Sequence, residues 1–147
     1  MKRHVLALSA MLAAISAQAA ELHILASPAA REAMTVVTPT FERQTGHHVV
    51  FEYQDEDLAQ TASKDDRLDA VLAPVVDMGV LARAYRIVPD TRRNLGRTAP
   101  TASAPQGVVL SIAALHGDHE DATRAFCAYL SLPETLVALR RSGLSTP

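Results

Sequence analysis

The sequence predicts an α/β domain with a mixed, mostly parallel sheet flanked by helices. Between residues 21 and 84, three short apolar runs are each followed by a segment with helical periodicity. Repeated strand–helix units are typical of parallel strands joined by right-handed crossovers. With 147 residues, the chain is long enough for one such domain. One cysteine, a net charge of −2 and 4% aromatic residues argue against a disulfide or cysteine–zinc fold and against a nucleic-acid partner.

The first unit combines a strand at 21–26 with a helix that opens at Ser27 and Pro28. Serine at the N-cap followed by proline at the first helical position favours a helix start. Apolar residues at helical spacing predict the buried face of this helix: Ala30, Ala33, Met34, Val37 and Phe41. Pro39 predicts a kink or break in the helix, since proline lacks the N–H that an interior position donates. Gly46 predicts its end.

The remaining elements continue the alternation of strands and helices. Strands are expected at 47–53, 68–73 and 108–115, and helices at 55–63, from 74 onward, after 118 and at 134–141. In the helix after Asp118, which we expect to be the N-cap, an apolar stripe predicts the buried face: Ala122, Ala125, Phe126, Tyr129 and Leu130. Residues 98–107 are rich in Thr, Ala, Ser and Pro and predict a linker.

The N-terminus predicts a secretory signal peptide. Basic residues at 2–4 precede an apolar run at 5–15, and Ala17-Gln18-Ala19 gives the small-x-small pattern before a cleavage point. We expect a signal at 1–19 and a mature chain at 20–147. The apolar run is too short to span a bilayer as a helix, and no cysteine offers a lipid anchor, so we expect no stable membrane anchor. Removing the signal leaves 12 basic and 16 acidic residues, a net charge near −4.

Several motifs occur in the order typical of one family. They are LHILASPAA, PTFERQTG, LDAVLAP and the closing GLSTP, which lie at 22–30, 39–46, 68–74 and 143–147. With the export signal, they resemble the type II periplasmic substrate-binding proteins of ABC transporters, above all the molybdate-binding group. The resemblance implies a periplasmic protein, not an enzyme, that needs no cofactor. It would bind a small oxyanion such as molybdate and deliver it to an ABC permease in the inner membrane.

One large departure separates this chain from that family. Its members have two α/β lobes, and the second lobe would be inserted between Arg97 and Val108, where this chain has only the linker at 98–107. The resemblance therefore implies a single lobe made of 20–97 and 108–147, in which the strand at 108–115 lies beside the third strand and antiparallel to it. A soluble remnant lobe, or an interaction module that binds no small molecule, is the alternative.

The resemblance places an anion between strand-to-helix turns, where free amides and the helix dipole favour negative charge. Ser27 and Ala29 match the first turn, and Gln54 matches the second. Pro28 removes one amide donor, and the carboxylates at 55–57 would repel an anion, so we expect weak binding. Two other interpretations stay open: Ser27 as an ordinary N-cap, and 55–57 as a solvated helix start.

The sequence offers little support for a metal or a catalytic centre. The cluster at 116–121 contains two histidines and three carboxylates, which suit zinc, but acidic residues at a helix start are explained by the dipole alone. His47 and His48 are adjacent on a strand and should point to opposite faces. Cys127 is expected to be partly buried and unreactive. No hydrolase, metalloprotease or phosphate-loop motif is present in the sequence, so we expect no catalytic residue and no metal ligand.

Overall fold

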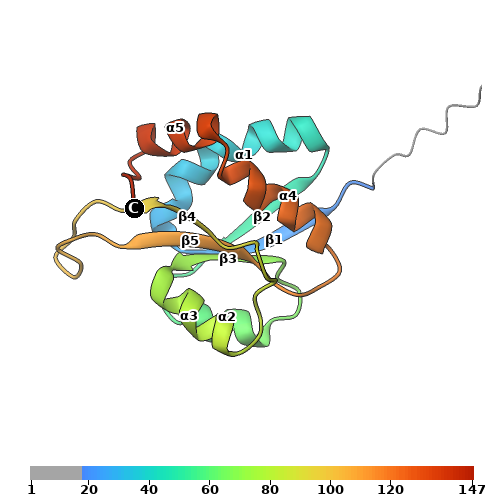
Figure 1. The fold of residues 1–147 in the computed structure, drawn as a ribbon, viewed down its shortest axis with the longest axis horizontal. Coiled ribbons are helices and arrows are strands. Elements are labelled where there is room, and N and C mark those ends of the chain that lie inside the picture. Colours follow the sequence, from blue (N-terminus) through green and yellow to red (C-terminus); the bar gives the residue numbers. More distant parts are fainter. Residues whose placement is uncertain (1–17) are drawn as a thin grey trace, which may run out of the picture.

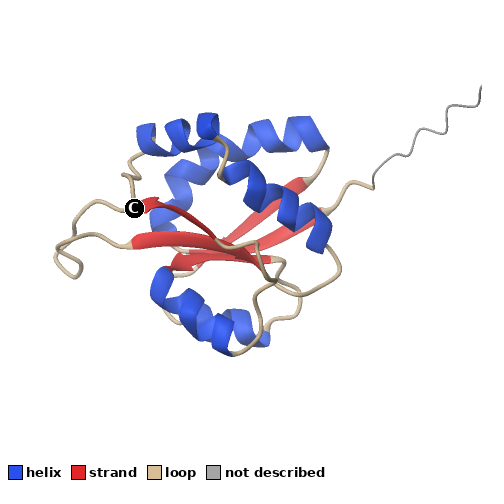
Figure 2. Cartoon of the chain, in the orientation of Figure 1, coloured by secondary structure: helices blue, strands red, loops and turns tan. Residues whose placement is uncertain are grey.

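A single mixed sheet organises the computed structural model, which describes residues 18–147 (Figures 1 and 2). The signal peptide expected at 1–19 falls almost wholly outside the described residues. The strands are β1 (Glu21–Ala26), β2 (His48–Tyr53), β3 (Ala70–Pro74), β4 (Arg93–Arg97) and β5 (Val109–Ala114). Their order across the sheet is β2-β1-β3-β5-β4.

The strand pairing confirms the expected topology. β1 is parallel to both β2 and β3, with Ala26 opposite Tyr53 on one side and Leu72 on the other. β5 lies beside β3 and runs antiparallel to it, with Ala73 opposite Ser111. The sheet is therefore mixed and carries its parallel strands at one side, as expected for 21–26, 47–53 and 68–73.

Helices cover both faces of the sheet in Figure 1. They are the 3-10 turn η1 (Pro28–Ala30), α1 (Arg31–Thr45), α2 (Leu58–Lys64), α3 (Val75–Arg83), α4 (Glu120–Leu130) and α5 (Pro133–Arg141). One face packs against α1, α4 and α5, and the other packs against α2 and α3. No helix in residues 18–147 is long and apolar enough to cross a membrane.

The β4 strand was not expected from the sequence. It forms the edge of the sheet beside β5, with a register shift between Asn94 and Gly96. On its other side it pairs with the C-terminal segment, because the amide of Arg97 donates to the carbonyl of Ser145 at 2.8 Å. Residues 98–107 join β4 to β5 and contain neither helix nor strand.

Of the two outcomes expected at Pro39, a kink or a break, the break does not occur, since α1 runs without interruption from Arg31 to Thr45. Figure 1 shows the ribbon of α1 changing direction along its length, so the helix accommodates the proline by bending. The predicted stripe is buried, and Phe41 packs against Phe126 with ring centroids 4.9 Å apart. Gly46 ends the helix at a φ of 76°, a left-handed conformation that glycine adopts readily.

Two expectations about α4 need correction. His119, and not Asp118, is the N-cap, and its side chain makes no capping hydrogen bond. The buried face of α4 is displaced from the predicted stripe: Thr123, Phe126, Cys127 and Leu130. Ala125 is exposed, whereas Cys127 is fully buried against β4 and β5. The apolar pattern misled because small alanines lie on both sides of this helix.

Candidate functional site

The carboxyl ends of β1 and β2 bring the predicted anion-binding residues to one edge of the sheet. Ala26 and Tyr53 are paired at the ends of these parallel strands. The amide of Gln54 donates to the carbonyl of Ala26 at 3.0 Å, so the two strand-to-helix turns begin side by side. Ligands of open α/β sheets bind outside this edge. The backbone of Ser27 and Gln54 therefore lies where the sequence predicted a site.

Ser27 is held by its backbone and leaves its hydroxyl unused. Its amide donates to the carbonyl of Leu72 at 2.8 Å, and its carbonyl accepts from the amide of Ala30 at 3.0 Å. The hydroxyl makes no capping hydrogen bond. The interpretation of this serine as an ordinary side-chain cap therefore has no support among residues 18–147, and the half-buried hydroxyl is available to a ligand.

Ala29 is an exposed residue two positions after Ser27. It is the second residue of η1, and its N–H has no hydrogen-bond partner among the described residues. Ala29 also lines a cavity of about 320 Å³ between α1, the loop after β4 and the C-terminal segment. Ser27 and Ala29 thus present two donors at the start of the first helix.

Gln54 is placed differently from the expectation. Its side-chain amide turns toward α2, where Nε2 donates to the hydroxyl of Thr61 at 2.8 Å and to the carbonyl of Glu56. These bonds organise the turn between β2 and α2. The side-chain donors of Gln54 would have to leave Thr61 and Glu56 to contact a ligand beside Ser27.

Arg31 is a residue of this edge that the sequence analysis missed. Its guanidinium carbon lies 4.1 Å from the ring centroid of Tyr53, which ends β2. Burial raises the pKa of the Tyr53 hydroxyl, and the nearby Arg31 charge partly offsets that rise. Arginine in the first turn of α1 opposes the helix dipole. That unfavourable placement is the feature of the sequence that could have drawn attention to Arg31.

Carboxylates surround the neighbouring turn at the same edge of the sheet. Asp55, Glu56 and Asp57 are exposed between β2 and α2, and Asp57 adopts a left-handed φ of 57°. Asp77 lies in the first turn of α3. Burial raises the pKa of Asp77, with a further rise from the charge of Asp57, while a hydrogen bond from the Ala59 amide lowers it. This half of the edge therefore disfavours an anion.

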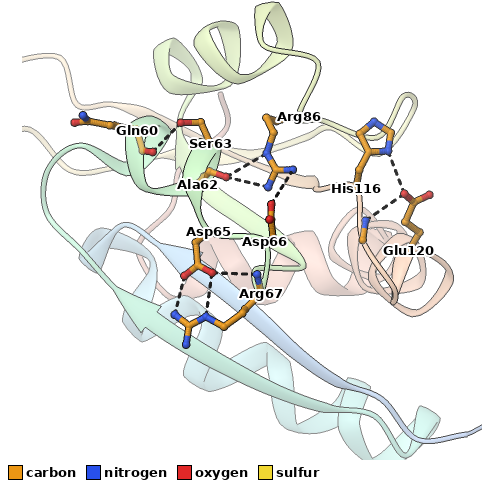
Figure 3. A network of polar contacts seen from close by, with 10 residues as sticks. Gln60, Ala62, Ser63, Asp65, Asp66, Arg67, Arg86, His116 and Glu120 are labelled. Carbon is orange, nitrogen blue, oxygen red and sulfur yellow. Dashed lines mark hydrogen bonds and ion pairs between the residues drawn. The ribbon is translucent and has the colours of Figure 1, made fainter.

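The histidine cluster at 116–121 lies at the opposite, amino edge of the parallel strands. His119 Nδ1 lies 3.1 Å from Oδ1 of buried Asp69, and His116 Nδ1 lies 3.1 Å from Oε1 of Glu120. Figure 3 shows His116 turned toward Glu120, far from the Asp65–Arg67 pair. Within residues 18–147, no group of three His, Cys, Asp or Glu side chains could hold a metal ion.

A large cavity also lies at that amino edge. Its volume is about 760 Å³, and residues 18–20, His47 and 117–122 line most of it. The amide of Ala20 donates to Nδ1 of His47 at 3.0 Å. This hydrogen bond holds the residue before β1 against His47, beside the cavity. The cavity contains none of the residues that the sequence placed in an anion site.

Comparisons with known proteins find solved structures with a similar fold. No family model and no curated protein matches the chain. Among solved structures, it is similar to the periplasmic molybdate-binding protein of Azotobacter vinelandii, with a TM-score of 0.72 and 9% identity over 86% of this chain and 99% of that one. It is also similar to the substrate binding domain assigned to a molybdenum ABC transporter of Clostridium difficile, with a TM-score of 0.70 and 11% identity over 88% and 100%.

A sulfate-binding protein of Mycobacterium tuberculosis is a third similar structure, with a TM-score of 0.64 and 10% identity over 85% of this chain and 86% of that one. This chain has the fold of a periplasmic binding-protein domain. The expected fold class is thereby confirmed. At identities of 9–11%, the likeness establishes the fold and leaves the ligand to be argued from the residues.

Proposed function

We propose that this chain is an exported solute-binding protein that binds a small oxyanion of the molybdate or sulfate class at the carboxyl edge of its sheet. Support comes from the fold it shares with molybdate- and sulfate-binding proteins. The observation that carries the proposal is the pair of unused donors at Ser27 and Ala29. Arg31 stands in the adjoining turn and supplies a positive charge at this edge.

The protein acts as a single lobe in this proposal. Residues 98–107, which join β4 to β5, hold no helix or strand that could build a second lobe there. An anion at the exposed edge would stay partly hydrated, which weakens each charge–dipole interaction. Losing even three charge-assisted hydrogen bonds, at about 1.5–3 kcal/mol each, would weaken binding by roughly three to six orders of magnitude. We therefore expect the affinity for the oxyanion to be low. In this proposal the protein delivers the solute to an ABC permease in the inner membrane.

A second candidate function is a remnant lobe or interaction module that binds no small molecule. The carboxylates at 55–57 and at Asp77 favour it, because they place negative charge beside the proposed anion site. The occupied side chain of Gln54 favours it as well. Both candidates share the same fold, so only ligand binding separates them.

A thermal-shift screen distinguishes these candidates. The exported form is heated with increasing molybdate, sulfate or a divalent metal, and with sodium chloride at matched ionic strength. A ligand of the native state raises the melting temperature with its concentration. We expect molybdate or sulfate to do so at millimolar concentrations, beyond the effect of chloride. An equal response to all anions would instead support the remnant lobe.

A further inference from the structure

Six arginines gather around β4, the edge strand of the sheet. Three belong to the strand or immediately precede it, one comes from α4, and two end α5. We call them the basic edge: Arg92, Arg93, Arg97, Arg124, Arg140 and Arg141. Arg92, Arg124 and the two arginines of α5 are exposed, and the other two are half-buried.

Backbone contacts place these arginines toward the two ends of β4. Arg93 donates to the carbonyl of Asp90 at 2.8 Å, and Arg124 donates to the carbonyl of Pro89 at 3.4 Å. Two guanidinium groups from different elements therefore meet at the loop before β4. The end of α5 returns to the same strand, because the residue Ser145, just beyond that helix, pairs with Arg97.

The basic edge carries positive charge that the fold does not neutralise. Among residues 18–147, arginine ion pairs are formed by Arg67 and Arg86, and by none of the six. The whole chain nevertheless has a net charge of −2. Acidic residues at 55–57 lie beyond β2, at the other side of the sheet. The same segments also carry acidic residues, namely Asp90, the two at the start of α4 and Glu134, but the six arginines outnumber these four, so this edge is net positive in a negative protein.

We propose that the basic edge docks the protein onto an anionic phospholipid surface. Its charges spread over a strand and two helices, which suits a membrane, where cations near the surface are attracted without a fixed partner geometry. Val137 is 42% exposed and lies one helical turn before Arg140 and Arg141. It adds an apolar side chain to the same part of α5. The contact would be peripheral, since no described helix can span a bilayer.

Vesicle co-sedimentation of the exported form, with its first residue established by N-terminal sequencing, tests this proposal. The protein should sediment with phosphatidylglycerol-containing vesicles at low salt, remain free with phosphatidylcholine vesicles, and dissociate as salt screens the charges. The triple variant R92Q/R140Q/R141Q removes side chains that make no hydrogen bond with residues 18–147. It should lower binding by about two orders of magnitude, at about fivefold for each arginine.

A matched variant, R43Q/R83Q/K64Q, removes the same charge away from β4 and should retain most of the binding. Equal losses in the two variants would overturn the proposal, and so would failure of the unaltered protein to bind anionic vesicles at low salt. Self-association of the edge variant, in a protein that ignores vesicles, would show that the arginines only protect an exposed strand. Binding to polyglutamate without binding to vesicles would indicate an acidic protein partner and would also overturn it.

Discussion

At the scale of single residues, a substitution of Ser27 tests whether its hydroxyl binds a ligand or stabilises the fold. Its hydroxyl caps no amide of η1, so Ser27→Ala should change the free energy of unfolding by less than about 0.5 kcal/mol. The same substitution should weaken oxyanion binding severalfold. Denaturant unfolding and calorimetry measure the two effects. A stability loss of about 1 kcal/mol or more would show that the hydroxyl is a cap after all.

Asp57 tests whether the carboxylates limit anion binding. Asparagine tolerates the left-handed conformation of this residue, so Asp57→Asn should fold normally while removing one negative charge from the edge. We expect molybdate to bind severalfold more tightly to this variant. Asp118→Asn, at the amino edge, is the matched control and should leave the affinity unchanged. An equal gain in both variants would mean that only net charge matters.

Cys127 should be unreactive in the native protein. Burial raises the pKa of its thiol to about 11, so about one molecule in a thousand carries the thiolate at pH 8. A thiol reagent at pH 8 should label the protein only after unfolding, and rapid labelling of the native protein would contradict the burial. The fold accepts the neutral thiol and disfavours the thiolate. The contribution of Cys127 to the free energy of unfolding is therefore complete below about pH 8 and decreases as the pH rises toward 11.

At the scale of elements, the C-terminal segment and β4 depend on Gly96. A Cβ at this position would lie 2.6 Å from the carbonyl oxygen of Ser145, and its φ of 156° is unusual for other residues. Gly96→Ala should therefore separate the C-terminal segment from β4 and lower the free energy of unfolding by about 2 kcal/mol or more. Gly117→Ala, which meets no atom within 4 Å, should have little effect. Similar losses in both variants would contradict this packing.

The sequence was most informative where local pattern and tertiary packing agree. Short apolar runs predicted β1 and β5 because those strands are buried on both faces of the sheet. The sequence did not predict β4, because most of its residues are polar and it forms by pairing with β5 and with Ser145, which lie far along the chain. For the proposed site, Ser27 and Ala29 came from the resemblance to the binding-protein family, whereas Arg31 depends on its contact with Tyr53 across the fold.

At the scale of the whole molecule, opposite charges occupy different parts of one α/β layer structure. The acidic residues at 55–57 follow β2, at one side of the sheet, and the arginines of the basic edge lie around β4, at the other side. Taken together, the two proposals describe a protein that binds an anion weakly at one edge and docks onto negative surfaces from another. The two properties use different residues, so variants of one should leave the other intact.

An amide NMR titration of residues 20–147, the mature chain expected from the sequence, with molybdate at constant ionic strength tests the central claim most directly. We predict that the amides of Ser27, Ala29 and Arg31 shift together, with a dissociation constant in the high micromolar range or weaker. A constant below about 1 μM, near −8 kcal/mol, would contradict weak binding by a single lobe and would require further donors, such as those of a second subunit. Shifts confined to the cavity beside His47, or no shift at all, would contradict the anion site itself.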